Sequence, residues 1–209
     1  MRTFRTRTTR ALGLTGAAAA AALLLAACGN DDTMSGMDHG GTSSATTTAT
    51  AAPSASGTSG TFNDADVMFA QMMIPHHEQA LEMAELADGR AEDADVKKIV
   101  AAIEKAQDPE IRKMKAWLRG WGQPEPAGTH HGMAGMMSEQ DMKDLAAAKG
   151  KDFDRTFAEL MIAHHEGAVE MAKTEQKNGG NAEAKALAGE VVTAQTTEIT
   201  ELRKILDRL

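Results

Sequence analysis

The feature that most constrains this chain is an internal repeat, because a fold that uses it must pack two copies of one unit together. Moving residues 64–119 along the chain by 88 positions places them on residues 152–207, within the second repeat at 152–209, without a gap. In the first half of each copy the identical positions are Phe69, Ala70, Met73, Ile74, His76, His77, Glu78, Ala80, Glu82, Met83 and Ala84, which coincide with Phe157, Ala158, Met161, Ile162, His164, His165, Glu166, Ala168, Glu170, Met171 and Ala172. The register continues into the second half, where Ile99, Ile103, Gln107, Glu110, Ile111 and Leu118 coincide with Leu187, Val191, Gln195, Glu198, Ile199 and Leu206.

Each copy of the repeat has the pattern of two helices joined by a short break. Apolar residues recur three and four positions apart, and Ala, Met, Leu, Glu and Lys are abundant, as they are in helices. The predicted helices cover residues 64–88, 92–119, 152–178 and 182–208. The short breaks favour antiparallel neighbours, and no segment alternates like a strand. We therefore expect an all-α four-helix bundle built from two helical hairpins with pseudo-twofold symmetry.

The folded domain should cover residues 61–209, with one long connection between the repeats at residues 120–151. This linker begins with a Gly- and Pro-rich stretch, and Ser138 has the pattern that opens a short capped helix. Residues 28–60 are mainly Gly, Ser, Thr and Ala, which bury too little apolar surface to offset the entropy of ordering. They are expected to form a flexible tether.

The first 27 residues resemble a bacterial lipoprotein signal peptide. Arg2, Arg5, Arg7 and Arg10 precede an apolar run that is too short for a comfortable membrane span, and the run ends at Leu25–Cys28, which resembles a lipobox. The resemblance implies cleavage before Cys28, lipid attachment to its thiol, and anchoring at the outer face of the cytoplasmic membrane. The alternative is a plain secretory signal with a chance cysteine.

The composition of the mature chain excludes some classes of protein. Without the four arginines of the signal, 18 basic residues stand against 30 acidic ones, a net charge of −12, so nucleic acid is not an expected partner. Cys28 is the single cysteine. If it carries lipid, a metal site in this exported protein would have to use His, Met and carboxylate ligands.

The paired histidines lie on or beside the apolar face of the first predicted helix of each repeat. On a helical wheel His76 and His164 fall at the centre of that face and His77 falls at its edge. One alternative is that each is a core histidine, hydrogen-bonded to another helix. The repetition, and nearby thioethers at helical spacing, favour a soft or borderline metal instead. The candidate ligands are His76, His77, His164, His165, Met73, Met83, Met161 and Met171.

Two segments outside the predicted helices contain the same kinds of ligand, among Gly, Ser, Thr and Asp residues that do not form a core. They hold Met34, Met37 and His39, and then His130, His131, Met133, Met136 and Met137. Thioether sulfur is a poor ligand for Mg or Ca and a good one for Cu(I) or Ag(I), while the imidazoles would also accept Cu(II) or Zn. These segments are expected to collect copper, Cu(I) in particular. Low-complexity drift is the alternative.

Two further features of the paired-histidine helices lead to structural predictions. Glu78 and Glu166 follow the histidine pairs and should face solvent, at the surface or behind the metal ligands. Pro75, which is Ala163 in the second repeat, removes a backbone hydrogen bond and either kinks the helix or is tolerated as a bend.

The two repeats resemble the DUF305 family over nearly all of the region 62–209. The family pattern M-I-x-H-H-x-x-A-x-x-M-A is matched twice, by Met73, Ile74, His76, His77, Ala80, Met83 and Ala84, and by Met161, Ile162, His164, His165, Ala168, Met171 and Ala172. The resemblance implies a ferritin-like four-helix bundle in an exported protein, with copper binding suggested for some members. It implies no catalysed reaction.

Three functions remain open from the sequence. The first is a lipid-anchored protein that captures copper, buffers it or passes it to a copper-handling partner. The second is a structural or pH-responsive helical interaction module with core histidines. The third, a ferritin-like metal oxidoreductase, would need inward glutamates and Glu-x-x-His motifs, which neither repeat contains. We therefore do not expect an enzyme.

Overall fold

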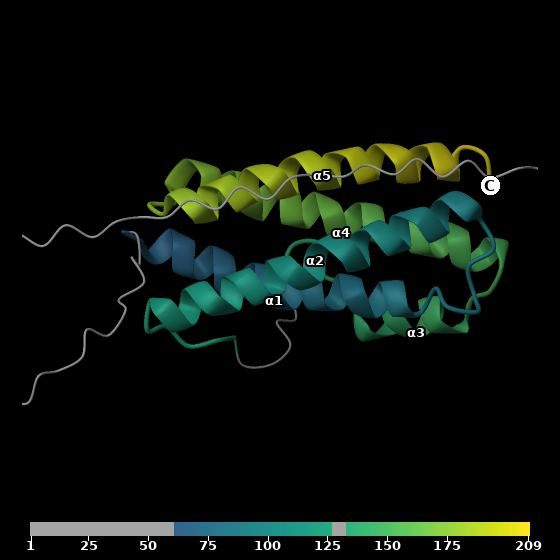
Figure 1. Ribbon diagram of the computed structural model, residues 1–209. Coiled ribbons are helices and arrows are strands. Elements are labelled where there is room, and N and C mark those ends of the chain that lie inside the picture. Colours follow the sequence, from purple (N-terminus) through teal and green to yellow (C-terminus); the bar gives the residue numbers. More distant parts are fainter. Residues whose placement is uncertain (1–60, 127–132) are drawn as a thin grey trace, which may run out of the picture. The chain divides into compact units, whose positions relative to one another are not determined.

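The computed structural model describes residues 61–126 and 133–209, and in these ranges the regular structure is entirely helical (Figure 1). The five helices are α1 (Asp64–Glu85), α2 (Ala94–Gly120), α3 (Glu139–Ala147), α4 (Lys151–Asn178) and α5 (Ala182–Leu206). The predicted all-α class is confirmed, and the ends of the four long helices lie within three residues of the predicted ones. None of these helices is long and apolar enough to cross a membrane.

Side-chain caps define where four of these helices begin, and Asn181 provides the one at α5. The Asn63 side chain accepts from two backbone N–H groups of α1, while Asp66 accepts from the Asn63 backbone, so the pair forms a capping box. Ser138 and Asp141 form the same arrangement at α3, which confirms the short helix predicted there. The Asp93 side chain caps α2. Helix α1 continues through Pro75 without a break.

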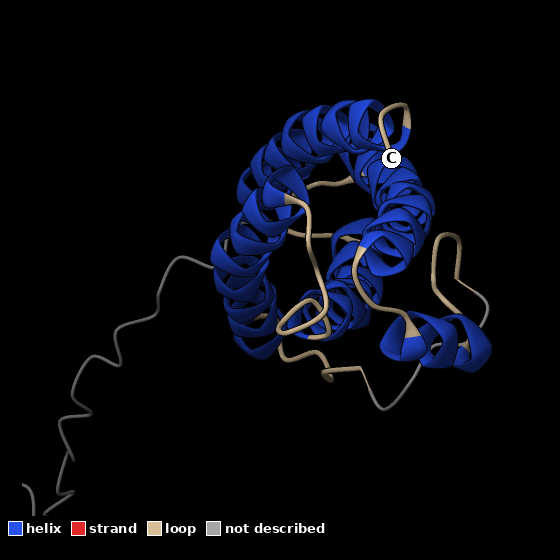
Figure 2. Ribbon diagram, turned by 90° about the vertical axis from the view of Figure 1, so that its right-hand side faces the viewer, coloured by secondary structure: helices blue, strands red, loops and turns tan. Residues whose placement is uncertain are grey.

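The four long helices form two antiparallel hairpins that pack on each other. Helix α1 pairs with α2 and α4 with α5, while α1 packs against α4 and α2 against α5. Figure 2 shows these helices surrounding a common interior, with α3 outside the ring. The short helix contacts α4. This is the predicted bundle of two similar hairpins, with α1 and α4 facing each other across the pseudo-twofold axis.

The interior contains two apolar clusters, and each draws residues from both hairpins. One contains Met83, Phe153 and Phe157, and the other contains Phe69 and Ala168. Along α1 and along α4, the paired histidines fall between the residues of one cluster and those of the other. The fold therefore places four imidazoles in the middle of the bundle, where solvent does not reach.

Candidate metal centre

His76 and His164 meet at the centre of the bundle. Their ring centroids are 3.8 Å apart and the ring planes are tilted by 42°. Both residues are buried, with 0% and 1% of their surface exposed. Both residues lie at the centre of the apolar face of their helices, and the contact between them joins α1 to α4 at the pseudo-twofold axis.

Three of the four ring nitrogens of this pair lack a hydrogen-bond partner among the described residues. His76 Nε2 lies 3.3 Å from the carbonyl oxygen of Ala134, in the linker. His76 Nδ1 has no partner among the described residues, and neither nitrogen of His164 has one. A buried polar atom without a partner costs about 1–3 kcal/mol, so three such nitrogens in one contact need an explanation.

Burial keeps both imidazoles neutral. Burial and the neighbouring His77 lower the pKa of His76 to about 3, although the contact with the Ala134 carbonyl acts in the opposite direction. Burial also lowers the pKa of His164 well below its usual value, helped by the proximity of His76. A neutral imidazole has a free lone pair, which is the form that binds a metal ion.

His77 and His165 form a second, symmetric pair of contacts. His77 Nε2 lies 2.7 Å from Glu110 Oε2 on α2, and His165 Nε2 lies 2.7 Å from Glu198 Oε2 on α5. Both histidines are fully buried, more deeply than the helical wheel indicated for His77. These contacts were not predicted from the sequence. Both glutamates recur at the spacing of the repeat, and that recurrence could have indicated that they contact the repeated histidines.

The glutamates that follow the histidine pairs lie at the surface, as expected. Glu78 pairs with Lys115 at 2.6 Å and Glu166 with Arg203 at 2.7 Å. About half of each glutamate side chain is exposed, so these ion pairs contribute little to stability. They join the two helices of each hairpin at equivalent positions.

The four methionines proposed from the repeat do not converge on the His76–His164 contact as one group. Met83 and Met161 are buried in the apolar cluster with Phe157, whereas Met73 is buried in the cluster with Phe69. Met171 is half-buried and packs against that second cluster. The pseudo-twofold axis thus divides the methionines between the two sides of the histidines.

The part of the linker after residue 132 lies against α4 beside the histidines. Gly135 has a φ of +81°, and a Cβ there would be 2.9 Å from the carbonyl oxygens of Ala163 and His164. A Cβ on Gly167 would be 2.2 Å from the Ala134 carbonyl oxygen. Two glycines therefore allow the linker to approach closely enough for Ala134 to reach His76.

One methionine of this linker corrects an expectation. Met137 is buried in the cluster with Phe157, so it packs in the core. Because its sequence neighbours are polar, the linker methionines were not expected to contribute to a core. Its backbone is held by Gln79, which donates to the Met137 carbonyl at 3.0 Å and accepts from its N–H at 2.7 Å. Met133 and Met136 are half-buried.

The remaining candidate ligands lie outside the described residues. These are Met34, Met37, His39, His130 and His131, and the predicted lipidation site Cys28 also lies outside the described residues. Within ranges 61–126 and 133–209, no group of three or more His, Cys, Asp or Glu side chains is placed to hold a metal ion. A site here would therefore use two imidazoles, with thioether or solvent ligands, rather than a preformed carboxylate and histidine cage.

The comparisons with known proteins agree with this architecture. The family described as "Domain of unknown function (DUF305)" matches residues 66–206. Among solved structures, a DUF305 protein from Streptomyces coelicolor, provisionally described as secreted, is 32% identical, with a TM-score of 0.65 over 68% of this chain and 92% of that one. A DUF305 fragment from Deinococcus radiodurans is 33% identical, with a TM-score of 0.65 over 70% and 98%.

A third relative was solved with metals. CopM in its Cu(II)-bound form is 36% identical, with a TM-score of 0.62 over 68% of this chain and 95% of that one, and CopM has also been solved in Cu(I)-bound and Ag-bound forms. No curated protein matches this chain. The family model covers two thirds of the sequence and all four long helices, and the chain therefore belongs to the DUF305 family.

Proposed function

We propose that this protein binds copper outside the cytoplasm and holds the ion at the contact between His76 and His164. The ion would be buffered there or passed to a copper-handling partner protein. The observation that carries the proposal is the set of three buried ring nitrogens without a hydrogen-bond partner at this contact. A metal ion would be a partner for two of them, one on each ring, while the third, on His164, carries the proton of a neutral imidazole.

The chemistry of the pair suits Cu(I). Two neutral imidazoles are borderline donors that accept copper, and Cu(I) tolerates low coordination numbers. Imidazole lone pairs lie in the ring planes, so two rings tilted by 42° with their centroids 3.8 Å apart do not both aim at one point. Binding one ion between His76 and His164 therefore requires at least one ring to turn. Cu(II) or Zn(II) would need further ligands, which the described residues do not place nearby.

The symmetric contacts around the pair would support such a site. His77 and His165 lie next to the proposed ligands along α1 and α4, and each is held at 2.7 Å by a carboxylate from the other helix of its hairpin. These contacts fix the backbone and side-chain positions around His76 and His164. Partners behind the ligands tune a metal site in this way in many proteins.

The relatives add independent support. CopM, at 34–36% identity, was crystallised with Cu(I), Cu(II) and Ag bound, and it spans the same helices. The export signal, the lipid on Cys28 and collection of the ion by the loop residues His130 and His131 remain parts of the proposal. Together they would place the bundle at the outer face of the cytoplasmic membrane.

A Cu(I) titration tests the histidine site. The protein would be titrated anaerobically against a competing chelator, with Cu(II) and Zn(II) compared. His76→Leu/His164→Leu should lose the tight site and remain folded, because leucine fills the space and removes buried polar atoms. A variant with His130→Ala and His131→Ala serves as the control for loop binding. Equal Cu(I) affinity in the leucine variant and the unchanged protein would reject the bundle site.

A second function is favoured by one observation. The low pKa of His76 means that the folded bundle resists protonation of this imidazole. Acid therefore favours an opened bundle, in which the imidazole can take up a proton. A pH-responsive helical module would use that property without metal. A bundle that binds no copper in any form, and unfolds steeply below pH 6.5, would support this alternative.

A further inference from the structure

A groove between α1 and α4 is lined by a group of methionines, two of which have no equivalent methionine in the second repeat. The groove has a volume of about 460 Å³ and is lined by Met68 and Met72 from α1 and by Met171 from α4. Met68 is 59% exposed, the largest exposed fraction among the large apolar side chains of the described residues. In the second repeat Thr156 and Leu160 occupy the positions equivalent to Met68 and Met72, so the group exists on one side of the bundle.

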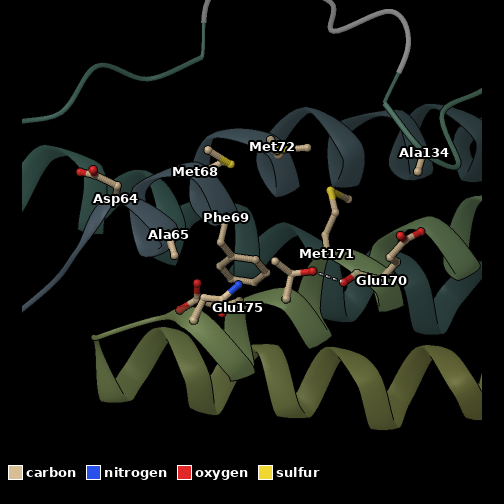
Figure 3. Close-up of a pocket in the computed structure, with 11 residues that line it drawn as sticks. Asp64, Ala65, Met68, Phe69, Met72, Ala134, Glu170, Met171 and Glu175 are labelled. Carbon is tan, nitrogen blue, oxygen red and sulfur yellow. Dashed lines mark hydrogen bonds between the residues drawn. The ribbon is translucent and has the colours of Figure 1, made fainter.

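The spacing of the residues brings their thioethers to one place. Met68 and Met72 are four residues apart and so lie one turn apart on the same face of α1. Figure 3 shows Met171 reaching from α4 toward the α1 segment that holds Met68 and Met72. Three thioethers from two helices therefore border one groove that is open to solvent at Met68.

The same groove contains a buried acid. Glu175, one turn beyond Met171 on α4, lines the groove and lies beside Phe69, yet only 1% of its surface is exposed. No basic side chain and no backbone N–H among the described residues donates to its carboxyl oxygens, and its side-chain partner is another acid, Asp66. The equivalent residue of the first repeat is Ala87, so the fold itself does not demand an acid here. Two neighbouring buried acids without a basic partner favour a cation close to them, because a positive charge stabilises the ionised form of both.

We infer that this groove is a separate binding site for one soft monovalent cation, Cu(I) or Ag(I), held by the thioethers of Met68, Met72 and Met171. Thioether sulfur selects such ions over Mg, Ca and Zn. Three thioethers carry no charge, so the bound cation would leave an uncompensated positive charge in a largely apolar groove. The acid Glu175 lies behind the ligands and would balance that charge in its ionised form.

The groove also borders the histidine contact. Ala134 lines it, and the carbonyl oxygen of Ala134 is the group that lies 3.3 Å from His76 Nε2. Met72 and His76 are four residues apart on α1, and His164 and Met171 are seven apart on α4, so the same faces of both helices lead from the thioethers to the imidazoles. The thioether site does not depend on copper binding at the histidines.

Ag(I), which is not redox-active here, is the probe for this site. The full chain with Cys28→Ala would be labelled with ¹³C at the methionine methyl groups and titrated with silver nitrate. The substitution His76→Leu/His164→Leu would be present in a parallel sample. We expect the methyl resonances of Met68, Met72 and Met171 to shift together, with a single midpoint, in both samples.

Substitutions then separate ligands from packing. Met68→Leu/Met72→Leu/Met171→Leu should abolish this site while leaving the fold intact, since Leu and Met have similar volumes. Met114→Leu/Met142→Leu removes thioethers elsewhere and should leave the site unchanged. Glu175→Gln should keep the three methyl groups responsive but weaken Ag(I) binding about tenfold, a typical cost of losing a group behind the ligands.

The outcomes distinguish the two sites. Shifts of the three groove methyl groups in the histidine-free sample would support the groove, whether or not the histidines bind copper. Three methyl groups that stay unshifted, or that shift with different midpoints, would overturn the groove site. Unchanged Ag(I) affinity in Glu175→Gln would overturn the role of the acid.

Discussion

Asp66, in the first turn of α1, accepts a 2.8 Å hydrogen bond from the backbone N–H of Asn181, which begins α5 at the other end of the domain sequence. It also accepts from the Gly180 N–H at 3.0 Å. Asp154 does the same for the other hairpin, accepting from the N–H of Asp93 at 2.8 Å and from that of Glu92. Each hairpin thus holds the loop that joins the two helices of the other hairpin. Asp66 and Asp154 occupy equivalent positions of the repeat.

Removing either aspartate should loosen one end of the bundle. Burial raises the pKa of Asp66, but the N–H bonds from Asn181, Asn63 and Gly180 lower it more, so the carboxylate is ionised and strongly hydrogen-bonded. Asp66→Ala should lower the free energy of unfolding by about 3 kcal/mol because it leaves buried N–H groups unpaired. Urea denaturation measures the loss, and amide exchange at Asn181 should accelerate selectively. Unchanged exchange at that amide would contradict the role of the contact.

Acid should destabilise the metal-free bundle through the central histidines. The unfolded chain takes up a proton on His76 near pH 6.5, whereas the folded protein resists it until the pH approaches 3. The pKa is lower in the folded state, so this stability is present above pH 6.5 and is lost as the pH falls. His76 alone should cost about 2 kcal/mol at pH 5, and His164 adds to it.

The control for the acid effect is His76→Leu/His164→Leu, measured by urea denaturation at pH 7.5, 6 and 5. Carboxylates titrate in both proteins, so the difference between the two curves isolates the histidines. The variant should be at least as stable as the unchanged protein at pH 7.5 and should lose less stability at pH 5. Parallel pH dependence would show that His76 is protonated in the folded bundle without cost.

Glu175→Gln should stabilise the metal-free protein at neutral pH. Burial, together with the hydrogen bond to Asp66 and the charge of Asp66, raises the pKa of Glu175 to about 8. The folded pKa exceeds that of the unfolded chain, so Glu175 favours folding below about pH 4.5 and this contribution is lost as the pH rises toward 8. Replacing it should raise the free energy of unfolding by about 1–3 kcal/mol at pH 7.

The pH profile of Glu175→Gln checks the cause. The gain over the unchanged protein should be small at pH 4.5 and grow up to pH 8, when both are measured by urea denaturation. A constant gain would show a packing effect instead. A residue whose removal stabilises the fold while it weakens Ag(I) binding is one that the protein retains for binding rather than for stability.

Gly167→Ala should displace the linker from the histidines. The new Cβ would lie 2.2 Å from the Ala134 carbonyl oxygen, a backbone atom that cannot move aside as a flexible side chain can. We expect a loss of about 1–3 kcal/mol, as for other overpacked sites, together with a change in the chemical shifts of the His76 ring. Gly189→Ala is the matched control.

In the control, the added Cβ of Gly189→Ala meets only the end of the Gln176 side chain, at 3.1 Å. Since alanine is the better helix former, this variant should gain up to about 1 kcal/mol. Equal effects of the two substitutions on thermal unfolding would show that the linker does not pack closely on Gly167.

Local patterns in the sequence were sufficient to predict the helices, the hairpins and the central position of His76 and His164. Helical periodicity depends on neighbours three and four residues away, and the repeat required the second hairpin to copy the first. The capped start of α3 at Ser138 is another local signal, and it was predicted correctly.

Contacts between distant segments decided the rest. The carboxylates that contact His77 and His165 come from other helices. The burial of Met137 and the contact of Ala134 with His76 depend on where the single linker crosses the symmetric pair of hairpins. That crossing explains why one repeat has Gln79, which binds the linker, where the other has Gly167, which makes room for it. The sequence by itself determined which faces are buried, because burial follows periodicity within a helix. Only the tertiary structure decided which polar atoms meet, since that depends on packing between residues far apart in the chain.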